Sequence, residues 1–119
     1  MSVIDQEALA RIFEGDDDLL ADLSTMFVKL LPDIRARLRV AIEERDWKSA
    51  EELAHQMKGR LGYFGATNLQ TLAKEIEKEA QNNSSDEISD LYDDLFQGIV
   101  EMVGELSQLT NLELNISDE

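Results

Sequence analysis

The chain contains one histidine, His55, which is its strongest candidate for chemistry. An imidazole changes protonation near neutral pH, and its unprotonated form is a competent nucleophile. Lys58 follows three residues later, a spacing that on a helix lets its ammonium group interact with an anion carried by the ring. Glu51 and Glu52 lie about one turn before His55. They are candidates for orienting the ring or favouring its protonated form, although solvated helical acids are the commoner explanation.

The residues around His55 predict a helix with one apolar face and one open face. At about 100° per residue, one face collects a stripe of apolar side chains. These are Ala50, Leu53, Ala54, Met57, Leu61 and Phe64. His55, Gly59 and Gly62 fall on the opposite face, where each glycine costs about 1 kcal/mol relative to alanine. A lone histidine is most often a surface residue without chemistry, but glycines beside it suggest that another protein must approach closely.

The elements that would position His55 are all predicted to be helical. A short helix is expected over residues 3–13 with Asp5 as its N-cap, followed by a long one from the acidic run 16–18 almost to Arg45. Pro32 lies inside the long helix, and because the apolar stripe continues past it we predict one kinked helix rather than two. That stripe is expected to bury Leu20, Leu23, Phe27, Leu30, Ile34, Leu38 and Ala41.

Three further helices are expected. Asp46 is predicted to cap the helix that carries His55, and Thr67 or Asn68 to open the next one. The inner face of that next helix is expected to hold Leu69, Leu72, Ala73, Ile76 and Ala80. After a polar connection at residues 82–85, a last long helix begins at Ile88.

Four substantial amphipathic helices with short connections predict an all-α fold. They are most easily buried as an antiparallel four-helix bundle in up-down-up-down order, with the short N-terminal helix across one end. We expect a single domain over residues 1–110 and a frayed tail over residues 111–119.

The net charge and the composition restrict the possible partners and the cellular compartment. The formal net charge of −15 over 119 residues argues against nucleic acid and anionic lipid as partners. There is no cysteine, and therefore no disulfide and no thiol chemistry. No apolar run approaches the roughly 20 residues of a membrane span, and the N-terminus lacks a signal-peptide pattern, so a cytoplasmic location is expected.

The residues around His55 also resemble a known family signature. The run His55-Gln56-Met57-Lys58-Gly59, followed by Gly65-Ala66 and Leu69, is similar to the signature of histidine-containing phosphotransfer (HPt) domains. The resemblance spans nearly the whole chain. Its other parts are Ile4-Asp5 with Ala8-Leu9, the Gly15-Asp16 segment, the Leu31-Pro32 region and Asp46-Trp47.

The resemblance implies a phosphorelay intermediate of two-component signal transduction. His55 would be the phosphoacceptor, taking a phosphoryl group from a receiver-domain aspartyl phosphate and passing it to another receiver. Lys58 would stabilise the phosphate, and Gly59 and Gly62 would allow close approach of the receiver. The expected partners are response-regulator receiver domains, including those of hybrid sensor histidine kinases, and the chain is expected to be a monomer.

The same resemblance implies no cofactor and no metal in this chain, because the magnesium ion belongs to the partner receiver. No ATP-binding motif is present, so an autonomous kinase is not expected. Two residues depart from the family pattern: Arg60 stands where small residues are common, and Arg45 where a turn glycine is common.

Two alternatives remain open. The chain is also compatible with a helical adaptor that binds receivers or other proteins without phosphotransfer. Glu52-Leu53-Ala54-His55 matches the Glu-x-x-His element of di-iron carboxylate bundles. Such a site needs a second element and inward-facing ligands, and the chain has no second histidine.

Overall fold

The computed structural model describes residues 3–83 and 87–114, and every regular element among them is helical. The all-α class predicted from the sequence is therefore confirmed. The helices are α1 (Gln6–Phe13), α2 (Asp17–Glu43), α3 (Trp47–Gly62), α4 (Thr67–Gln81) and α5 (Ile88–Thr110).

Aspartates start the first three helices, as their positions predict. The Asp5 carboxylate accepts hydrogen bonds from the backbone N–H groups of Glu7 and Ala8, and Asp16 accepts one from Leu19. Asp46 accepts from the hydroxyl of Ser49 at 2.7 Å and from its backbone N–H at 3.3 Å, and these bonds lower the pKa of Asp46. Each carboxylate satisfies N–H groups that the first helical turn leaves unpaired.

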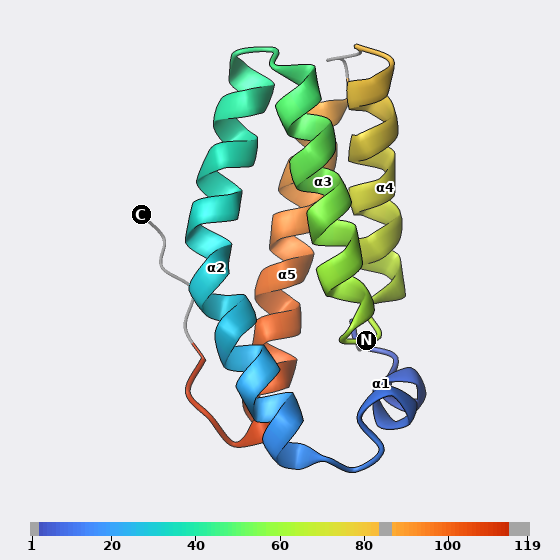
Figure 1. Ribbon diagram of the computed structural model, residues 1–119, viewed down its shortest axis with the longest axis vertical. Coiled ribbons are helices and arrows are strands. Elements are labelled where there is room, and N and C mark those ends of the chain that lie inside the picture. Colours follow the sequence, from blue (N-terminus) through green and yellow to red (C-terminus); the bar gives the residue numbers. More distant parts are fainter. Residues whose placement is uncertain (1–2, 84–86, 115–119) are drawn as a thin grey trace.

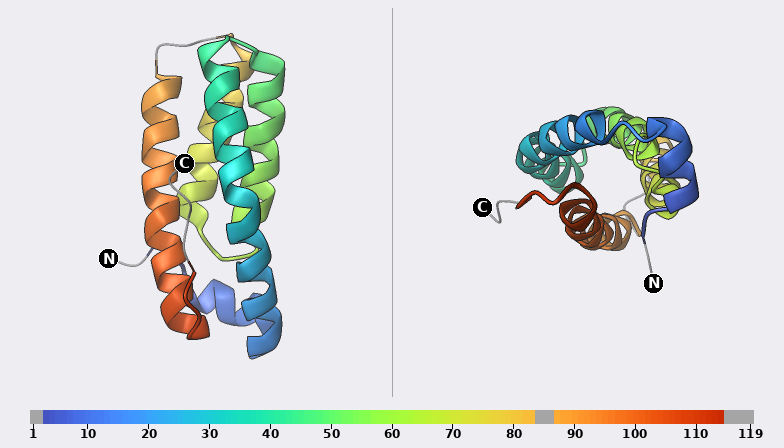
Figure 2. Two further views of the ribbon diagram at one scale, coloured as in Figure 1. Left: turned by 90° about the vertical axis from the view of Figure 1, so that its left-hand side faces the viewer. Right: turned by 90° about the horizontal axis from the view of Figure 1, so that it is seen from below.

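Helices α2 to α5 lie side by side and enclose the core (Figure 1). Contacts join α2 to α3, α3 to α4, α4 to α5 and α5 back to α2, which closes a ring of four helices. The end-on view in Figure 2 shows this ring, with α1 lying across one end of it. No helix in the described part of the chain is long and apolar enough to cross a membrane.

The long helix α2 runs without a break through Pro32, which confirms one helix rather than two, and the kink stays a prediction. Its buried stripe differs from the predicted one in its middle. Leu31 is 1% exposed and Ser24 is fully buried, whereas Leu30 is 38% exposed and Leu23 is only partly buried. The buried positions are Leu20, Ser24, Phe27, Leu31, Ile34, Leu38 and Ala41. They are separated by alternating steps of four and three residues. This spacing buries Ser24 in place of the more apolar Leu23, and Leu31 in place of the equally apolar Leu30.

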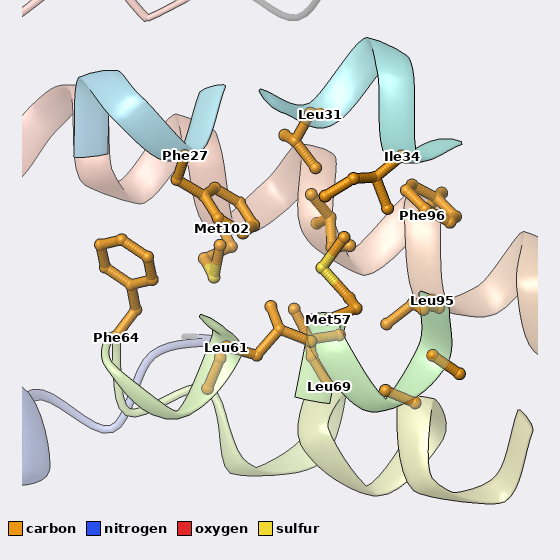
Figure 3. Close-up of a cluster of buried hydrophobic side chains, with 14 of the residues drawn as sticks. Phe27, Leu31, Ile34, Met57, Leu61, Phe64, Leu69, Leu95, Phe96 and Met102 are labelled. Atoms are coloured by element: carbon orange, nitrogen blue, oxygen red, sulfur yellow. The ribbon is translucent and has the colours of Figure 1, made fainter. Parts of the chain in front are cut away.

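The core joins all four long helices. Figure 3 shows Phe27 of α2 and Phe64 of the α3–α4 turn pointing toward one another. Their ring centroids are 5.3 Å apart at an interplanar angle of 61°, an edge-to-face contact. Met57 and Leu61 of α3, both fully buried, lie in the same cluster. The predicted apolar face of α3 is thus confirmed, and its burial leaves the opposite face of that helix in solvent.

The N-terminal segment is bound to the bundle through backbone groups. The N–H of Asp5 donates to the carbonyl of Gly65 at 3.0 Å, and the N–H of Val3 donates to the Glu105 carboxylate of α5 at 2.7 Å. Gly65 has φ +66°, and a Cβ there would lie 2.9 Å from the carbonyl oxygen of Asp5. Only glycine therefore fits the turn that ends α3 against α1.

Arg45 stands where the family that the sequence resembles commonly has a turn glycine, and it adopts the left-handed conformation with φ +58°. The turn between α2 and α3 thus keeps the backbone that glycine favours, at a cost of about 1–2 kcal/mol for a residue with a side chain.

The connection before α5 and the C-terminal tail are only partly described. Residues 84–86 of the predicted polar connection, and residues 115–119 of the predicted frayed tail, lie outside the described residues. Of the tail, residues 111–114 are not helical, and the N–H of Leu114 donates to Oγ of Ser107 at 3.1 Å.

Candidate functional site

His55 lies midway along α3, on the face turned away from the core. Its side chain is 65% exposed, while its neighbours Ala54 and Met57 are fully buried. The ring is therefore open to a partner and does not point into the bundle, where a di-iron ligand would have to lie. Within the described residues no group of three or more His, Cys, Asp or Glu side chains could hold a metal ion.

A carboxylate from the neighbouring helix α4 holds the ring. Oε2 of Glu77 lies 2.9 Å from Nδ1 of His55, and Oε1 of the same carboxylate accepts a hydrogen bond from Nζ of Lys58 at 2.8 Å. The Glu77 side chain is only 13% exposed. One carboxylate thus joins the two α3 residues that the sequence singled out.

The electrostatics of this cluster keep Glu77 ionised. Partial burial acts to raise the pKa of Glu77, but the hydrogen bonds and charges of Lys58 and His55 together outweigh it and lower the pKa. An ionised carboxylate only accepts hydrogen bonds, so Nδ1 of His55 must be the donor. In the neutral ring this assigns the proton to Nδ1 and leaves the lone pair on Nε2.

The two glycines beside His55 differ in their surroundings. A Cβ added at Gly59 would meet nothing within 4 Å, so the helix surface there is open. A Cβ at Gly62 would lie 2.7 Å from Nε2 of Gln70, which donates a hydrogen bond to the carbonyl of Lys58 at 3.1 Å. Gly62 therefore makes room for a contact within the chain, and the approach of a partner to it stays a prediction.

The two glutamates proposed for the ring environment have other positions. Glu51 accepts a hydrogen bond from Nε2 of Gln81 at 2.7 Å. Glu52 lines a groove between α2 and α3 together with Asp46, Ser49 and Gln56. The carboxylate found at the ring is Glu77, which replaces Glu51 and Glu52 as the residue that orients it.

Sequence reasoning missed the residues that α4 contributes. Three side chains along one side of α4 make hydrogen bonds to α3: Gln70 to the carbonyl of Lys58, Glu77 to His55 and Lys58, and Gln81 to Glu51. We call these contacts the polar seam. Glu77 directly follows the buried Ile76, which places it at the border of the apolar stripe. That border position was the available signal, but nothing in the spacing linked it to a histidine 22 residues away.

Comparison with known proteins agrees with this architecture. The family model of the Hpt domain matches residues 22–112, about three quarters of the chain. Neither the search of curated proteins nor the search of solved structures returned a match. The chain therefore belongs to the Hpt domain family. Domains of this family are helical bundles that carry phosphoryl groups on histidine in phosphorelays, interact with receiver domains and are not autonomous kinases.

Proposed function

We propose that this chain is a phosphorelay intermediate in which His55 accepts a phosphoryl group from the aspartyl phosphate of one receiver domain and passes it to another. The observation that carries the proposal is the exposed imidazole whose Nδ1 is held by the Glu77 carboxylate. This arrangement presents Nε2 as a nucleophile without any need for a base to remove a proton.

The chemical step balances with the groups present at the two active sites. The lone pair of Nε2 attacks the phosphorus atom, an N–P bond forms, and the bond between phosphorus and the receiver's carboxylate oxygen breaks. The electron pair of that bond stays on the receiver, whose aspartate becomes a carboxylate again. The imidazole keeps its proton on Nδ1 and becomes positively charged, and the negative charge of Glu77 at 2.9 Å stabilises it.

Lys58 and Glu77 have separate roles in this proposal. The Lys58 ammonium group has three N–H donors, of which one is directed to Glu77, and the others are available to phosphoryl oxygens. Glu77 is a positioning residue: it fixes the tautomer of the ring and holds Lys58 beside it. The magnesium ion that the reaction uses belongs to the receiver, whose acidic site would meet this face of α3.

Gly59 provides the clearance for that approach. It lies one turn beyond His55 on the same face, and the space above it is empty. A longer side chain there would stand between the ring and the receiver while favouring the helix itself.

The test is transfer from a phosphorylated receiver to the purified chain. A labelled receiver is mixed with the wild-type protein, and the product is examined for a phosphoryl group that is stable in alkali and released in acid, as expected for phosphohistidine. His55→Gln is the matched variant, because it keeps a polar side chain at an exposed site. We expect labelling of the wild type and none of His55→Gln.

The main rival is an adaptor that binds receivers without accepting the phosphoryl group. Binding of several phosphorylated receivers without labelling of His55 would favour the adaptor. Labelling that persists in His55→Gln would also contradict the proposal, because the chain has no other histidine.

A further inference from the structure

The space beside Gly62 is filled by a side chain of α4, the neighbour of α3 (Figure 1). A Cβ at Gly62 would lie 2.7 Å from Nε2 and 3.5 Å from Cδ of Gln70. Since Cβ atoms do not come that close to other atoms, any side chain at position 62 must displace the Gln70 amide. A Cβ at Gly59, three residues earlier, would meet nothing within 4 Å. The two glycines therefore serve different surroundings, and that of Gly62 lies within the chain.

The Gln70 amide uses this space to reach the main chain of Lys58. Its Nε2 donates a hydrogen bond to the Lys58 carbonyl at 3.1 Å. In an α-helix the carbonyl of residue 58 also accepts from the N–H of residue 62, and its oxygen has two lone pairs for two donors. A Cβ on residue 62 would stand in the path of the second donor, so this bond depends on glycine at that position.

Lys58 is thus bound to α4 at two points. Gln70 bonds to its carbonyl, and Glu77 accepts a hydrogen bond from its Nζ at 2.8 Å. Gln70 and Glu77 are seven residues apart, about two turns, so they project from the same side of α4. The two bonds fix both the main chain and the ammonium group of Lys58 relative to the carboxylate that holds His55 at 2.9 Å.

The start of α4 is not held by a capping side chain. Its N-cap residue is Ala66, which makes no side-chain hydrogen bond, whereas aspartates cap α1, α2 and α3. An alanine supplies no acceptor to the first helical turn. The bond from Gln70 therefore does for this end of α4 what a cap does elsewhere, and it is directed at the residue expected to bind the phosphoryl group.

We propose that Gly62 and Gln70 are a pair of positioning residues for phosphotransfer, in which Gly62 leaves room for the Gln70 amide to hold Lys58 in place. This rests on the proposed function, and it gives Gly62 a role within the chain instead of clearance for the receiver. Both residues act on the phosphoryl group only through Lys58. A displaced ammonium group slows the chemical step and leaves receiver binding unchanged, because misplacement by about 1 Å is enough to lower a rate.

The experiment compares a small phosphoryl donor with a receiver. Phosphoramidate labels an exposed imidazole without docking, with ammonia as the leaving group, and a phosphorylated receiver at varied concentrations gives kcat and KM. Gly62→Ala places a Cβ against Nε2 of Gln70, and we expect it to slow labelling by phosphoramidate about threefold to tenfold. With the receiver, kcat should fall by a similar factor while KM changes less than about twofold.

Gly59→Ala is the matched control. It makes the same substitution in the same helix, at a site where the added Cβ meets nothing. Its labelling by phosphoramidate should differ from that of the wild type by less than about twofold. Alanine favours a helix over glycine, so both variants should melt no more than about 4 °C below the wild type. A lower rate at such a Tm is not an effect of unfolding.

A double-mutant cycle tests whether Gly62 acts through Gln70. Gln70→Ala removes the amide and should slow labelling by phosphoramidate by about the same factor as Gly62→Ala. Adding Gly62→Ala to Gln70→Ala should cause a further loss of less than about twofold, because the contact between the two residues is already gone.

The outcomes separate this proposal from the proposed function. Equal labelling of Gly62→Ala and the wild type by phosphoramidate, or a rise in KM with kcat unchanged, would overturn it and return Gly62 to receiver clearance. Losses that multiply in the double variant would overturn it as well. If no receiver labels the wild type, the relay function fails, and the phosphoramidate measurements still decide the positioning.

Discussion

The chemistry assigned to His55 depends on a residue of another helix. The Glu77 carboxylate is bonded to both His55 and Lys58, so one side chain fixes the tautomer of the ring and the position of the ammonium group. Lys58 alone would leave the ring free to turn. The His-Lys-Gly signature on α3 therefore describes only part of the site.

The lowered pKa of Glu77 predicts a pH-dependent contribution to stability. A carboxyl group whose pKa is lower in the folded state stabilises that state above its ordinary pKa, here 4.5, and loses the effect as the pH falls through the lowered value. We expect Glu77→Gln to be less stable than the wild type at pH 7, and the difference to shrink at about pH 3.5. Urea unfolding at both pH values measures it.

Glu75→Gln is the control for this prediction, because Glu75 is an exposed acid on the same helix. It should show little difference from the wild type at either pH. A deficit of Glu77→Gln that is the same at both pH values would mean that the two hydrogen bonds, and not the ionisation, stabilise the contact.

How far the site could be predicted follows from where its residues lie. His55, Lys58 and Gly59 share one helix, and helical geometry alone places them on or beside one face. Glu77 and Gln70 come from α4, and their pairing with α3 depends on how far the two helices are displaced along each other. A single sequence holds no periodicity that reports this displacement, so the α4 half of the site was not predictable.

At the scale of the elements, the N-caps of three helices were predictable. The start of the first helix, expected at residue 3 and found at Gln6, and one buried stripe were not. Asp5, Asp16 and Asp46 marked the starts of three helices because a short acid before an apolar repeat has a direct physical role. In α2 the predicted stripe passed through Leu23 and Leu30, whereas the observed steps of four and three residues from Leu20 bury Ser24 and Leu31 instead. Over 27 residues a small error in helical phase moves a side chain from the core to the surface.

The same stripe buries a hydroxyl without a partner, which leads to a prediction. Ser24 is fully buried, and no hydrogen-bond partner of its Oγ is found among the described residues. Ser24→Ala removes an unpaired polar group and raises helix propensity, so we expect a gain of about 1 kcal/mol in the free energy of unfolding. Urea denaturation measures this gain.

Ser107→Ala provides the contrast. The Ser107 hydroxyl accepts a hydrogen bond from the N–H of Leu114, so its removal leaves that N–H unpaired and should cost about 1 kcal/mol. A loss of stability in Ser24→Ala would show that the Ser24 hydroxyl is hydrogen-bonded in the folded protein.

At the scale of the whole molecule, the net negative charge is large for a domain of these dimensions. The net charge of −15 is carried on a molecule whose principal extents are 42 × 28 × 23 Å. The screening length falls from about 30 Å at 0.01 M salt to about 10 Å at 0.1 M. At the lower salt concentration, carboxylates on opposite sides of the bundle therefore still repel one another.

This repulsion predicts a stabilising effect of salt. Raising NaCl from about 0.01 M to 0.1 M should increase stability by about 1 kcal/mol, or roughly 4 °C in Tm for a domain of this size. Calorimetry at both concentrations gives the shift, and KCl should reproduce it because only ionic strength matters. A Tm that falls with salt would mean that attractive ion pairs outweigh the repulsion.

The polar seam between α3 and α4 has one more consequence. Its contacts lie near both ends of α4 and between them: Gln81 with Glu51, Glu77 with His55 and Lys58, and Gln70 with the carbonyl of Lys58. If α4 slid along α3 by one turn, about 5.4 Å, all of these bonds would break together. The position of the Glu77 carboxylate along the helix axis, relative to the imidazole, is therefore held in part by Gln70 and Gln81, which do not contact the ring.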